Sequence, residues 1–426
     1  MKLPAFHPWV WRCTALALAC LVGSGSALAE PDDDTLDRWL PSTTQVAAAL
    51  NASPAIAAAR AQREAQLERA QAIQVGPHEW ALRLSQHSRR VQDPSSRFNE
   101  TSATLERPVR LWGKADLDRQ LAEQNREVAR IGLADALHEA SRQLMLRWID
   151  VLRAQREAAS ATRELALAQA LHRQALVRLR QGDIAPLDAR LAEAELQRAQ
   201  AVQLQAQARQ TGTQASLLHL YPGLPTPTWP QADAFAPTPG EEAGEALRIY
   251  LNQHHELNLM RAEGLRLQRL ADRLDKDRWP DPTLGVYTSR ERAGAEQVLG
   301  LSLSVPLPGQ YRQSQARAAQ AEAQVAQDKL RQMELQLGAE FAARWQQWQQ
   351  GQQALAATQA AAEVQSQAAE KSLLAYTLGE HSMTELIQNR RLANEQRLAR
   401  DRLQLDQVQG WALLQLDLHR VWDLDD

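Results

Sequence analysis

Apolar residues follow two different periods along this chain, one typical of long helices and the other of short strands. The helical pattern fills residues 114–181 and 313–378, which contain no proline and are rich in Ala, Gln, Leu, Glu and Arg. This composition favours helices with narrow apolar stripes that pack side by side through small residues. At 1.5 Å per residue, each segment predicts a helix of roughly 100 Å. On their own, the two segments leave an ordinary long coiled coil as the alternative.

A period of two residues predicts a β-hairpin at 281–306. In EQVLGLSLSVPLPG (296–309) four apolar side chains fall on one face of the strand, and glycine and serine fall on the other. The partner DPTLGVYTSR (281–290) alternates through Leu284 and Val286, and the short polar segment RERAGAE connects the two. Such alternation is typical of a strand with one apolar and one polar face.

An earlier hairpin is predicted at 79–109, with weaker alternation. Its segments are EWALRLSQHSR (79–89), where a tryptophan and two leucines share one face, and RFNETSATLERPVRLWGK (97–114). We assign Arg83 and Arg107 to the polar side of these strands, which makes the alternation less clear than in the later hairpin.

Together the hairpins supply four strands of about ten residues, long enough to cross a bilayer when tilted. Four strands cannot close a barrel, and an open edge in lipid leaves backbone groups without hydrogen bonds. We therefore expect the chain to oligomerise, since three copies would supply twelve strands. The alternative is a soluble sheet packed on the helices.

The two halves of the chain are copies of one unit. Gly182 and Gly379 each interrupt a helical pattern, and 197 residues separate them. The same offset aligns Trp148 with Trp345, and each lies in an apolar stripe with the helical spacing i, i+4, i+7. Two shared landmarks and a shared order of elements favour duplication over chance agreement.

This duplication gives the domain division. The first repeat is expected at 30–221 and the second at 241–426, each with the order helix, hairpin, long helix, glycine turn, helix. The segment 222–240 between them is rich in proline, which prevents regular helix, so we interpret it as the inter-repeat linker.

The N-terminus has the pattern of a secretory signal peptide, expected at 1–29. Lys2 and Arg12 precede an apolar run that ends in small residues. An uncleaved anchor is the alternative, but the run is short for a membrane span. Cys13 and Cys20 both lie in this segment, so the mature chain has no thiol for a disulfide, a zinc site or a nucleophile. Lipid attachment at Cys20 is a second alternative.

Composition and motifs exclude several classes of function. The net charge of −3 is too balanced for a nucleic-acid partner, because phosphate binding needs a concentrated basic face. The chain contains no HExxH, GxxxxGK[ST], GxSxG or CxxC motif, so we expect no enzymatic activity and no cofactor. His254 and His255 are neighbours that point in different directions on a helix, which argues against a shared metal site. Near the strand ends, Trp80, Trp112 and Trp279 are candidates for an interfacial aromatic girdle.

The duplicated order of elements behind a signal peptide resembles the TolC-like outer membrane factors of Gram-negative export systems, over essentially the whole mature chain. The most specific pieces are the return segments RPVRLWGK and LSLSVPLPGQYR and the turn segments LRQGDIAPLDARLAEAELQ and YTLGEHSMTELIQNRR. The resemblance implies a mainly α-helical protomer with membrane β-hairpins. It also implies a homotrimer, with one shared twelve-stranded β-barrel in the outer membrane and a hollow α-helical barrel across the periplasm.

Such proteins are passive exit ducts joined to a periplasmic adaptor (membrane fusion protein) and an inner-membrane pump, here expected to be of the resistance-nodulation-division type. The compact length and the segments SLSVPLP, GDIAP and PDPTL are similar to the CzcC-like branch that serves heavy-metal efflux. The alternative function is a periplasmic adaptor or coiled-coil scaffold of an export system. Two helical hairpins in tandem argue against it, because an adaptor carries one.

On this resemblance each glycine turn lies at the far tip of the helical cylinder, where the long helix reverses and the adaptor docks. Glycine permits the backbone conformation that a tight reversal needs. The tip residues are Gly182, Asp183, Gly379 and Glu380. Asp183 and Glu380 are expected to cap the returning helices.

The resemblance also implies a gate at the tips. Tyr376 matches a tyrosine that ties the closed mouth in relatives through an acid, here Asp188. Glu385 matches an acid that faces the pore, so three protomers would form a carboxylate ring that attracts cations. His381 replaces an arginine of some relatives, and we hypothesise that its contact with Asp188 depends on pH. Ordinary turn and cap chemistry is the alternative for all four residues.

Overall fold

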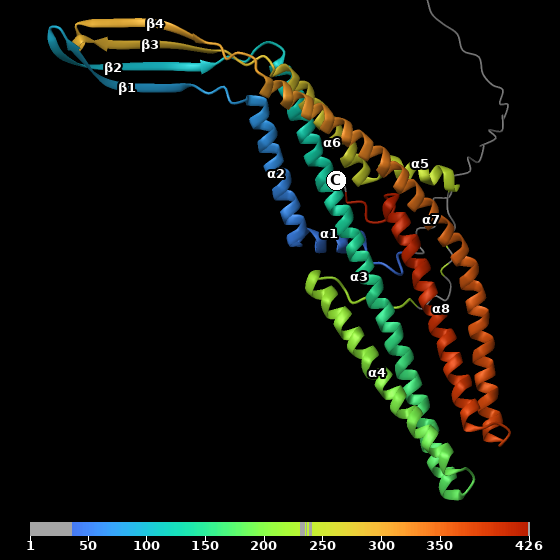
Figure 1. Cartoon of the computed structure of the whole chain (residues 1–426). Coiled ribbons are helices and arrows are strands. Elements are labelled where there is room, and N and C mark those ends of the chain that lie inside the picture. Colours follow the sequence, from blue (N-terminus) through green and yellow to red (C-terminus); the bar gives the residue numbers. More distant parts are fainter. Residues whose placement is uncertain (1–35, 231–234, 236, 238–240, 425–426) are drawn as a thin grey trace, which may run out of the picture.

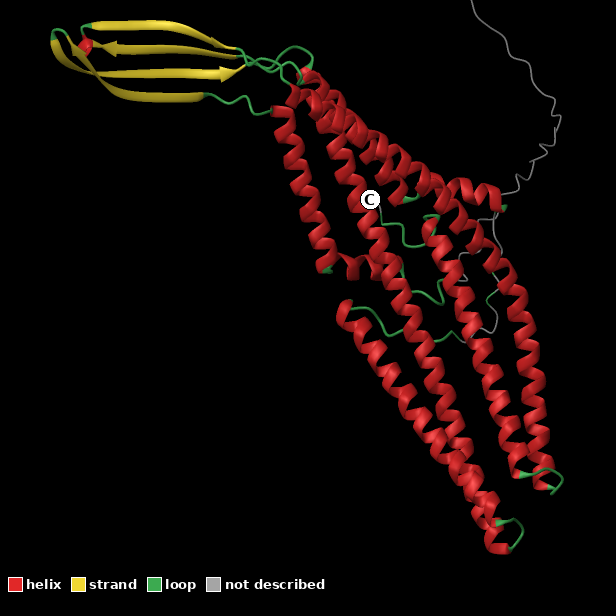
Figure 2. Ribbon diagram, in the orientation of Figure 1, coloured by secondary structure: helices red, strands yellow, loops and turns green. Residues whose placement is uncertain are grey.

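The computed structural model describes residues 36–230, 235, 237 and 241–424. The predicted signal peptide, with both cysteines, lies outside the described residues, as does most of the second half of the linker. The molecule is elongated, with a small sheet at one end and two helical tips at the other (Figure 1, Figure 2). No helix in the described ranges combines the length and the apolar character that a membrane span requires.

The order of elements occurs twice along the chain. The first copy consists of α1 (Thr43–Asn51), α2 (Pro54–Val75), β1 (Ala81–Gln92), β2 (Ser95–Pro108), α3 (Lys114–Gln181) and α4 (Pro186–Leu220). The second consists of α5 (Ala243–Gln253), α6 (His255–Lys276), β3 (Thr283–Glu291), a 3-10 turn η2 (Arg292–Gly294), β4 (Glu296–Ser304), α7 (Gln310–Thr377) and α8 (Met383–Asp417). Helices α3 and α7 both have 68 residues, and α4 and α8 both have 35.

The two longest helices set the length of the body. Helix α3 runs from the sheet to one tip, with α2 and α4 packed along its upper and lower parts, and α7 runs to the other tip beside α6 and α8 (Figure 1). Helix α3 also packs against α6 and α8, which joins the two copies into one body. The absence of proline allows each long helix to continue without a break.

A mixed aliphatic and aromatic core lies in the middle of this body. Trp148 and Trp345 are both buried there, and the indole N–H of Trp148 donates to the carbonyl of Trp39 at 2.7 Å. The other residues of the two predicted stripes are buried in the same core: Leu144, Val151, Phe341 and Trp348. Above and below this core the helices bury mainly alanine, so the backbones can lie close together over a long distance.

The four strands form one antiparallel sheet in the order β1-β2-β3-β4. Its register places apolar residues of all four strands in rows on one face: Leu82, Leu105, Val286 and Leu301 in one row, and Leu84, Ala103, Thr288 and Leu299 in the next. All of them except the half-buried Ala103 are exposed, Leu301 by 83% and Leu299 by 78%, and Thr288 is the one polar member of the two rows. The opposite face is polar and includes a row of serines, Ser85, Ser102 and Ser289. The sheet extends away from the helices, and none of the described α-helices lies against it (Figure 1).

The assignment of Arg107 to the polar face was wrong. Residues two apart in a strand share a face, and Leu105 belongs to the apolar row, so Arg107 lies on the apolar side. It sits at the helix-proximal end of β2, where its Nε donates to the carbonyl of His78 at 2.8 Å. Its guanidinium also lies 5.5 Å from the ring centroid of Trp80. A charge at the end of a strand can reach polar partners, which explains why the apolar side tolerates it.

A buried ion network joins the sheet to the helices. Lys114, at the start of α3, is 2% exposed, and its Nζ lies 2.9 Å from carboxylate oxygens of both Asp277 and Asp281. The same amine donates to the carbonyl of Trp279 at 2.7 Å, and Asp281 also accepts from the backbone N–H of Leu111 at 2.9 Å. The segment that leaves β2 is thereby fixed to the segment that enters β3.

These contacts set the ionisation of the two acids. Desolvation would raise the pKa of Asp277 and Asp281, but hydrogen bonds from Arg273 to the first and from Leu111 to the second, together with Lys114, outweigh it. Both pKa values therefore lie below their usual range. A carboxyl with a lowered pKa stabilises the fold above its unfolded-state pKa, and this stabilisation is lost as pH falls through the folded-state pKa.

We expect Lys114→Met to destabilise the protein by about 3 kcal/mol at neutral pH, because it removes the buried cation that Asp277 and Asp281 share, although Asp277 keeps Arg273. The difference from the wild type should shrink in acid, where the acids become protonated in both proteins. Thermal unfolding followed by circular dichroism at several pH values measures this, with Lys329→Met, on the exposed surface of α7, as the control. Equal unfolding midpoints for the two variants would show that the network does not stabilise the junction.

Candidate functional site

Both tips reverse through the same backbone motif. Gly182 and Gly379 have φ angles of +78° and +83°, in the left-handed region that favours glycine. The residue after each glycine, Asp183 or Glu380, donates its backbone N–H to a carbonyl five residues earlier, at 2.9 Å in both cases. This pattern is the Schellman motif, which satisfies carbonyl groups at the end of a helix.

The helices that return from the tips begin differently from the expectation. At α8, Ser382 and Glu385 form a capping box: the Ser382 N–H donates to Glu385 Oε2 at 2.8 Å, and the Glu385 N–H donates to Ser382 Oγ at 3.2 Å. Helix α4 begins at Pro186 without a capping side chain. Neither Asp183 nor Glu380 caps a helix, so that expectation was wrong. The Ser-x-x-Glu spacing in the sequence is the signal that indicates the capping box.

The capping box also acts on the charge of Glu385. The hydrogen bond from the backbone N–H of Ser382, with a further one from its hydroxyl, lowers the pKa of this exposed carboxyl. Glu385 is therefore anionic at neutral pH. One of the four proposed gate residues thus has a structural role within the single protomer.

Tyr376 is buried where the two helical hairpins meet. It is 4% exposed, and the Arg178 guanidinium of α3 lies 5.0 Å from its ring centroid, in cation–π geometry. Arg178 Nη1 also donates to the Tyr376 carbonyl at 3.3 Å, while the Tyr376 hydroxyl has no hydrogen-bond partner among the described residues. The surrounding cluster joins all four tip helices through Leu171, Ala175, Ala192, Met383, Leu386 and Ile387.

Asp188 lies in the first turn of α4, half-buried. Within the described residues, no hydrogen bond or ion pair joins it to Tyr376 or to His381. Its charge nevertheless acts on the tyrosine: burial raises the pKa of Tyr376, and Asp188 acts in the same direction. The structure of one protomer therefore brings Asp188 near Tyr376 without forming the expected tie.

His381 contacts its own hairpin. Its Nδ1 lies 3.3 Å from the hydroxyl of Ser372, a residue that is 2% exposed, and Asn389 donates to the same hydroxyl at 3.1 Å. A contact between His381 and Asp188 would therefore have to form between protomers.

A second link joins the tips through charge. Glu195 of α4 is 8% exposed, and Arg391 of α8 donates to it, with Nε 3.0 Å from its Oε2. Arg198 adds a bond from its Nη2 at 2.6 Å. These two guanidinium groups outweigh the effect of desolvation, which alone would raise the pKa of Glu195, and leave that pKa lowered. Movement of one hairpin against the other would have to break this contact and the Arg178–Tyr376 contact together.

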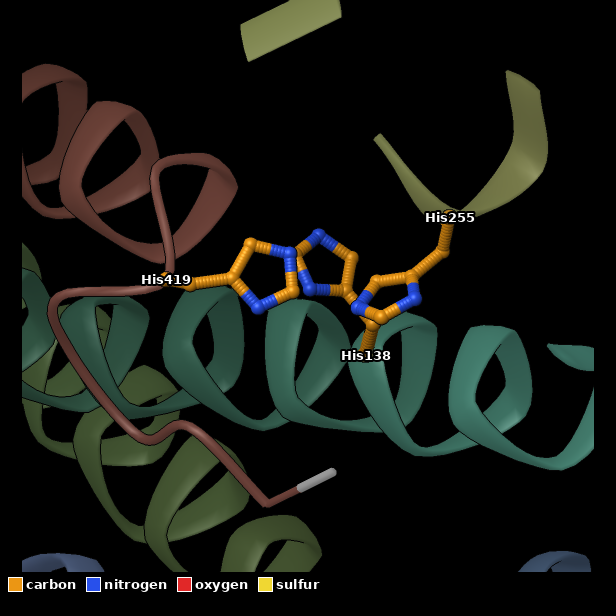
Figure 3. A group of neighbouring side chains, drawn as sticks. All are labelled: His138, His255 and His419. Atoms are coloured by element: carbon orange, nitrogen blue, oxygen red, sulfur yellow. The ribbon is translucent and has the colours of Figure 1, made fainter. Parts of the chain in front are cut away.

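The structure also brings together three histidines that no spacing or motif in the sequence groups. His138 of α3, His255 at the start of α6 and His419 after α8 converge, with possible ligand atoms all within 4.8 Å of one another (Figure 3). His254 packs against Tyr250 instead, with ring centroids 5.0 Å apart. Burial, reinforced by the neighbouring histidines, lowers the pKa of His255 to about 3, so this ring is neutral at neutral pH.

Comparisons with known proteins agree with this architecture. No protein-family model matches the chain. It is 26% identical over 219 residues to the cobalt-zinc-cadmium resistance protein CzcC of Cupriavidus metallidurans, a match that spans 51% of this chain and 52% of CzcC. The match thus spans about half the length of this curated relative.

Solved structures match over nearly the whole chain. The outer-membrane channel OprN is 18% identical, with a TM-score of 0.74 over 92% of this chain and 91% of its own. The CmeC outer membrane channel of Campylobacter jejuni is 13% identical, with a TM-score of 0.72 over 93% and 88%. The outer membrane protein VceC of Vibrio cholerae is 17% identical, with a TM-score of 0.70 over 89% and 95%. The protomer therefore has the TolC-like fold of these channels, and the resemblance seen in the sequence is confirmed at the level of the fold.

We expect Gly379→Ala to destabilise the second tip by roughly 1–2 kcal/mol. Apart from the glycine and its chain neighbours, no atom of the described residues lies within 4 Å of the added Cβ, so the cost comes from the positive φ. Hydrogen exchange of the amides around the α7–α8 turn measures the local effect.

Gly338→Ala is the matched control, since this glycine lies inside α7, also in open space. Here alanine should stabilise the helix by about 0.5–1 kcal/mol. Faster exchange in both variants would show that crowding, and not backbone conformation, governs these positions.

Proposed function

We propose that three copies of this chain form an outer membrane channel, the passive exit duct of a tripartite efflux system in a Gram-negative bacterium. The observation that carries the proposal is the sheet: on one face, two largely apolar and exposed rows cross all four strands, and among the described residues both outer strands have open edges. A sheet of this kind is stable in lipid only when its edges are paired.

Closure through neighbouring copies supplies that pairing. Four strands of 9 to 14 residues have the length of membrane strands. Joining β1 of one copy to β4 of the next gives a twelve-stranded barrel with the apolar rows outside and the serine row inside. At the end of the sheet nearest the helices, Trp80, Trp112 and Trp279 are 62%, 91% and 67% exposed. In this assembly they lie at the level of the lipid headgroups.

The helical body then extends into the periplasm as a hollow cylinder. The tips around Gly182 and Gly379 lie at the end opposite the sheet (Figure 1), where a periplasmic adaptor and an inner-membrane pump of the resistance-nodulation-division type would engage. The likeness to CzcC supports divalent heavy-metal cations as the cargo. The pump supplies the energy and selects the substrate, and this chain forms the duct through which the substrate leaves.

The gate belongs to the same proposal. Glu385 is exposed and anionic, so three copies around an axis place a carboxylate ring at the mouth, which favours cations. In the closed mouth, Asp188 of one protomer contacts Tyr376 or His381 of a neighbouring protomer. The buried Tyr376 hydroxyl supports this: Arg178 acts on its oxygen, but no acceptor for its proton is found among the described residues, and a buried polar group left unsatisfied costs about 1–3 kcal/mol.

Arginine substitutions on the two faces of β4 test the membrane assignment. Leu301→Arg places a charge in the middle of the apolar face, where lipid contact makes it cost about 2–4 kcal/mol. Ser302→Arg places the same charge on the opposite face and is the matched control. We expect Leu301→Arg to lower the yield of trimer in the outer membrane fraction, and Ser302→Arg to assemble normally and conduct in planar bilayers.

Both positions are exposed in the single protomer, so a soluble sheet would tolerate both substitutions. Equal recovery of the two variants as soluble, non-conducting protein would contradict the channel and favour a periplasmic adaptor or scaffold.

Single-channel conductance tests the gate. Asp188→Asn and Tyr376→Phe should each raise the open probability at neutral pH, because each removes one side of the closing contact. Tyr376→Phe keeps the ring against Arg178 and removes only the hydroxyl, so protomer stability should not fall.

His381→Ala is measured beside them between neutral and mildly acidic pH. Loss of the wild-type pH response is expected if its imidazole reaches Asp188 across the subunit boundary. An unchanged pH response would remove His381 from the gate, and unchanged conductance in the other two variants would assign all these residues to turn structure.

A further inference from the structure

We propose that His138, His255 and His419 form a binding site for a divalent transition metal of the zinc class, one in each subunit. The three rings come from separate segments and converge on one another in the middle of the helical body (Figure 3). Their ring centroids are 4.6 to 5.8 Å apart. The proposal does not depend on the channel function, because the three histidines lie within one protomer. The site would hold the segment after α8, which carries His419, against helices α3 and α6.

The donor set determines the class of metal. Three imidazole nitrogens suit zinc and the neighbouring first-row metals, whereas magnesium and calcium prefer oxygen ligands. A tetrahedral site with metal–nitrogen bonds of 2.0–2.1 Å requires nitrogens about 3.4 Å apart. The ligand atoms lie within 4.8 Å of one another, so ring movements of about 1 Å close the site.

The backbone at His419 is an independent sign of function. This residue has a φ of +57° and ends α8 through the same Schellman pattern as the tips, with its N–H donating to Leu416 at 3.0 Å and that of Arg420 donating to Gln415 at 2.9 Å. Glycine occupies the corresponding position at both tips. A histidine there costs roughly 1–2 kcal/mol, and strain of this kind gathers at functional sites.

Hydrogen bonds outside the cluster orient two of the rings. His138 Nε2 lies 3.2 Å from Asp417 Oδ1, and His419 Nε2 lies 3.3 Å from the carbonyl of Gln253. With Nε2 as the donor, His138 presents the lone pair of Nδ1 to the metal. In His419, Nδ1 is the donor to Asp423 Oδ1 at 3.5 Å, and Nε2, which points toward the other two rings, is the ligand atom in place of its contact with Gln253 (Figure 3). Metal-binding histidines in proteins are often held by an outer carboxylate of this kind.

The surroundings leave room for an ion and a path to it. A cavity of about 10 Å³, close to the space of one water molecule, lies among the three histidines. Beside it, a groove of about 670 Å³ reaches His255 and His419 from the surface. The Asp423 carboxylate borders both, with its Oδ1 3.5 Å from Nδ1 of His419. It is the outer partner that sets the tautomer of His419, and a bound water takes the fourth position.

Metal binding to the full-length protein, purified without a histidine tag and stripped with a chelator, tests the site. Titration with Zn²⁺ measures affinity and stoichiometry, and the absorption spectrum with Co²⁺ reports tetrahedral nitrogen ligation. We expect one metal per subunit. His419→Gly should weaken binding about ten- to hundredfold or more while leaving the apo protein folded, since glycine suits the positive φ.

His138→Gln should weaken binding to a similar extent, and His254→Gln, next to the cluster but outside it, should bind as the wild type does. If His138→Gln fails to fold, His419→Gly decides the question. Absence of stoichiometric binding by the wild type, or equal affinity in His419→Gly and the wild type, would overturn the site. Neither result would bear on the membrane assignment, which the Leu301 and Ser302 variants test.

Discussion

Backbone hydrogen bonding at the free edges of the sheet is the constraint on which the proposed assembly depends. In water, each Å² of apolar surface exposed in the rows around Leu301 would cost about 25 cal/mol of free energy. In lipid those rows are stable, but the unpaired groups of β1 and β4 are not. Neither environment suits the single protomer, and pairing with neighbouring copies satisfies both demands together.

A wall shared between subunits needs each sheet held at a fixed angle to its helices, and the ion network around Lys114 provides this. The segment that leaves β2 and the segment that enters β3 meet at the buried amine of Lys114. Its partners are Asp277 and Asp281. Ion pairs fix direction better than apolar contact does, because their hydrogen bonds are directional. The hydrophobic core around Trp148 lies farther along the body and stabilises the helices without orienting the sheet.

Local sequence signals predict most of this fold and little of its chemistry. Proline-free segments indicated the two long helices, and alternation indicated both hairpins, because these patterns repeat over many residues. Arg107 was assigned to the wrong face, since one charge near a strand end does not reveal the pairing. The three histidines could not be grouped because they are far apart in sequence, with no motif spacing. Contacts at the gate lie between protomers in the proposed assembly, so neither the sequence nor one protomer specifies them.

The duplication helps to separate what the fold requires from what it does not. Helices α3 and α7 both end at a glycine with positive φ, as any protein with these two tips needs. Helix α4, the counterpart of α8, ends at Leu220, and at the 197-residue offset His419 corresponds to Pro222 and His138 to Leu335. In the first copy the positive φ falls one residue later, on Gly223. The histidine cluster therefore has no equivalent in the other copy, although the same scaffold is present in both. The proposed metal site gives a reason for a histidine, and not a glycine, at this positive φ, because the turn places the His419 ring against the rings of His138 and His255.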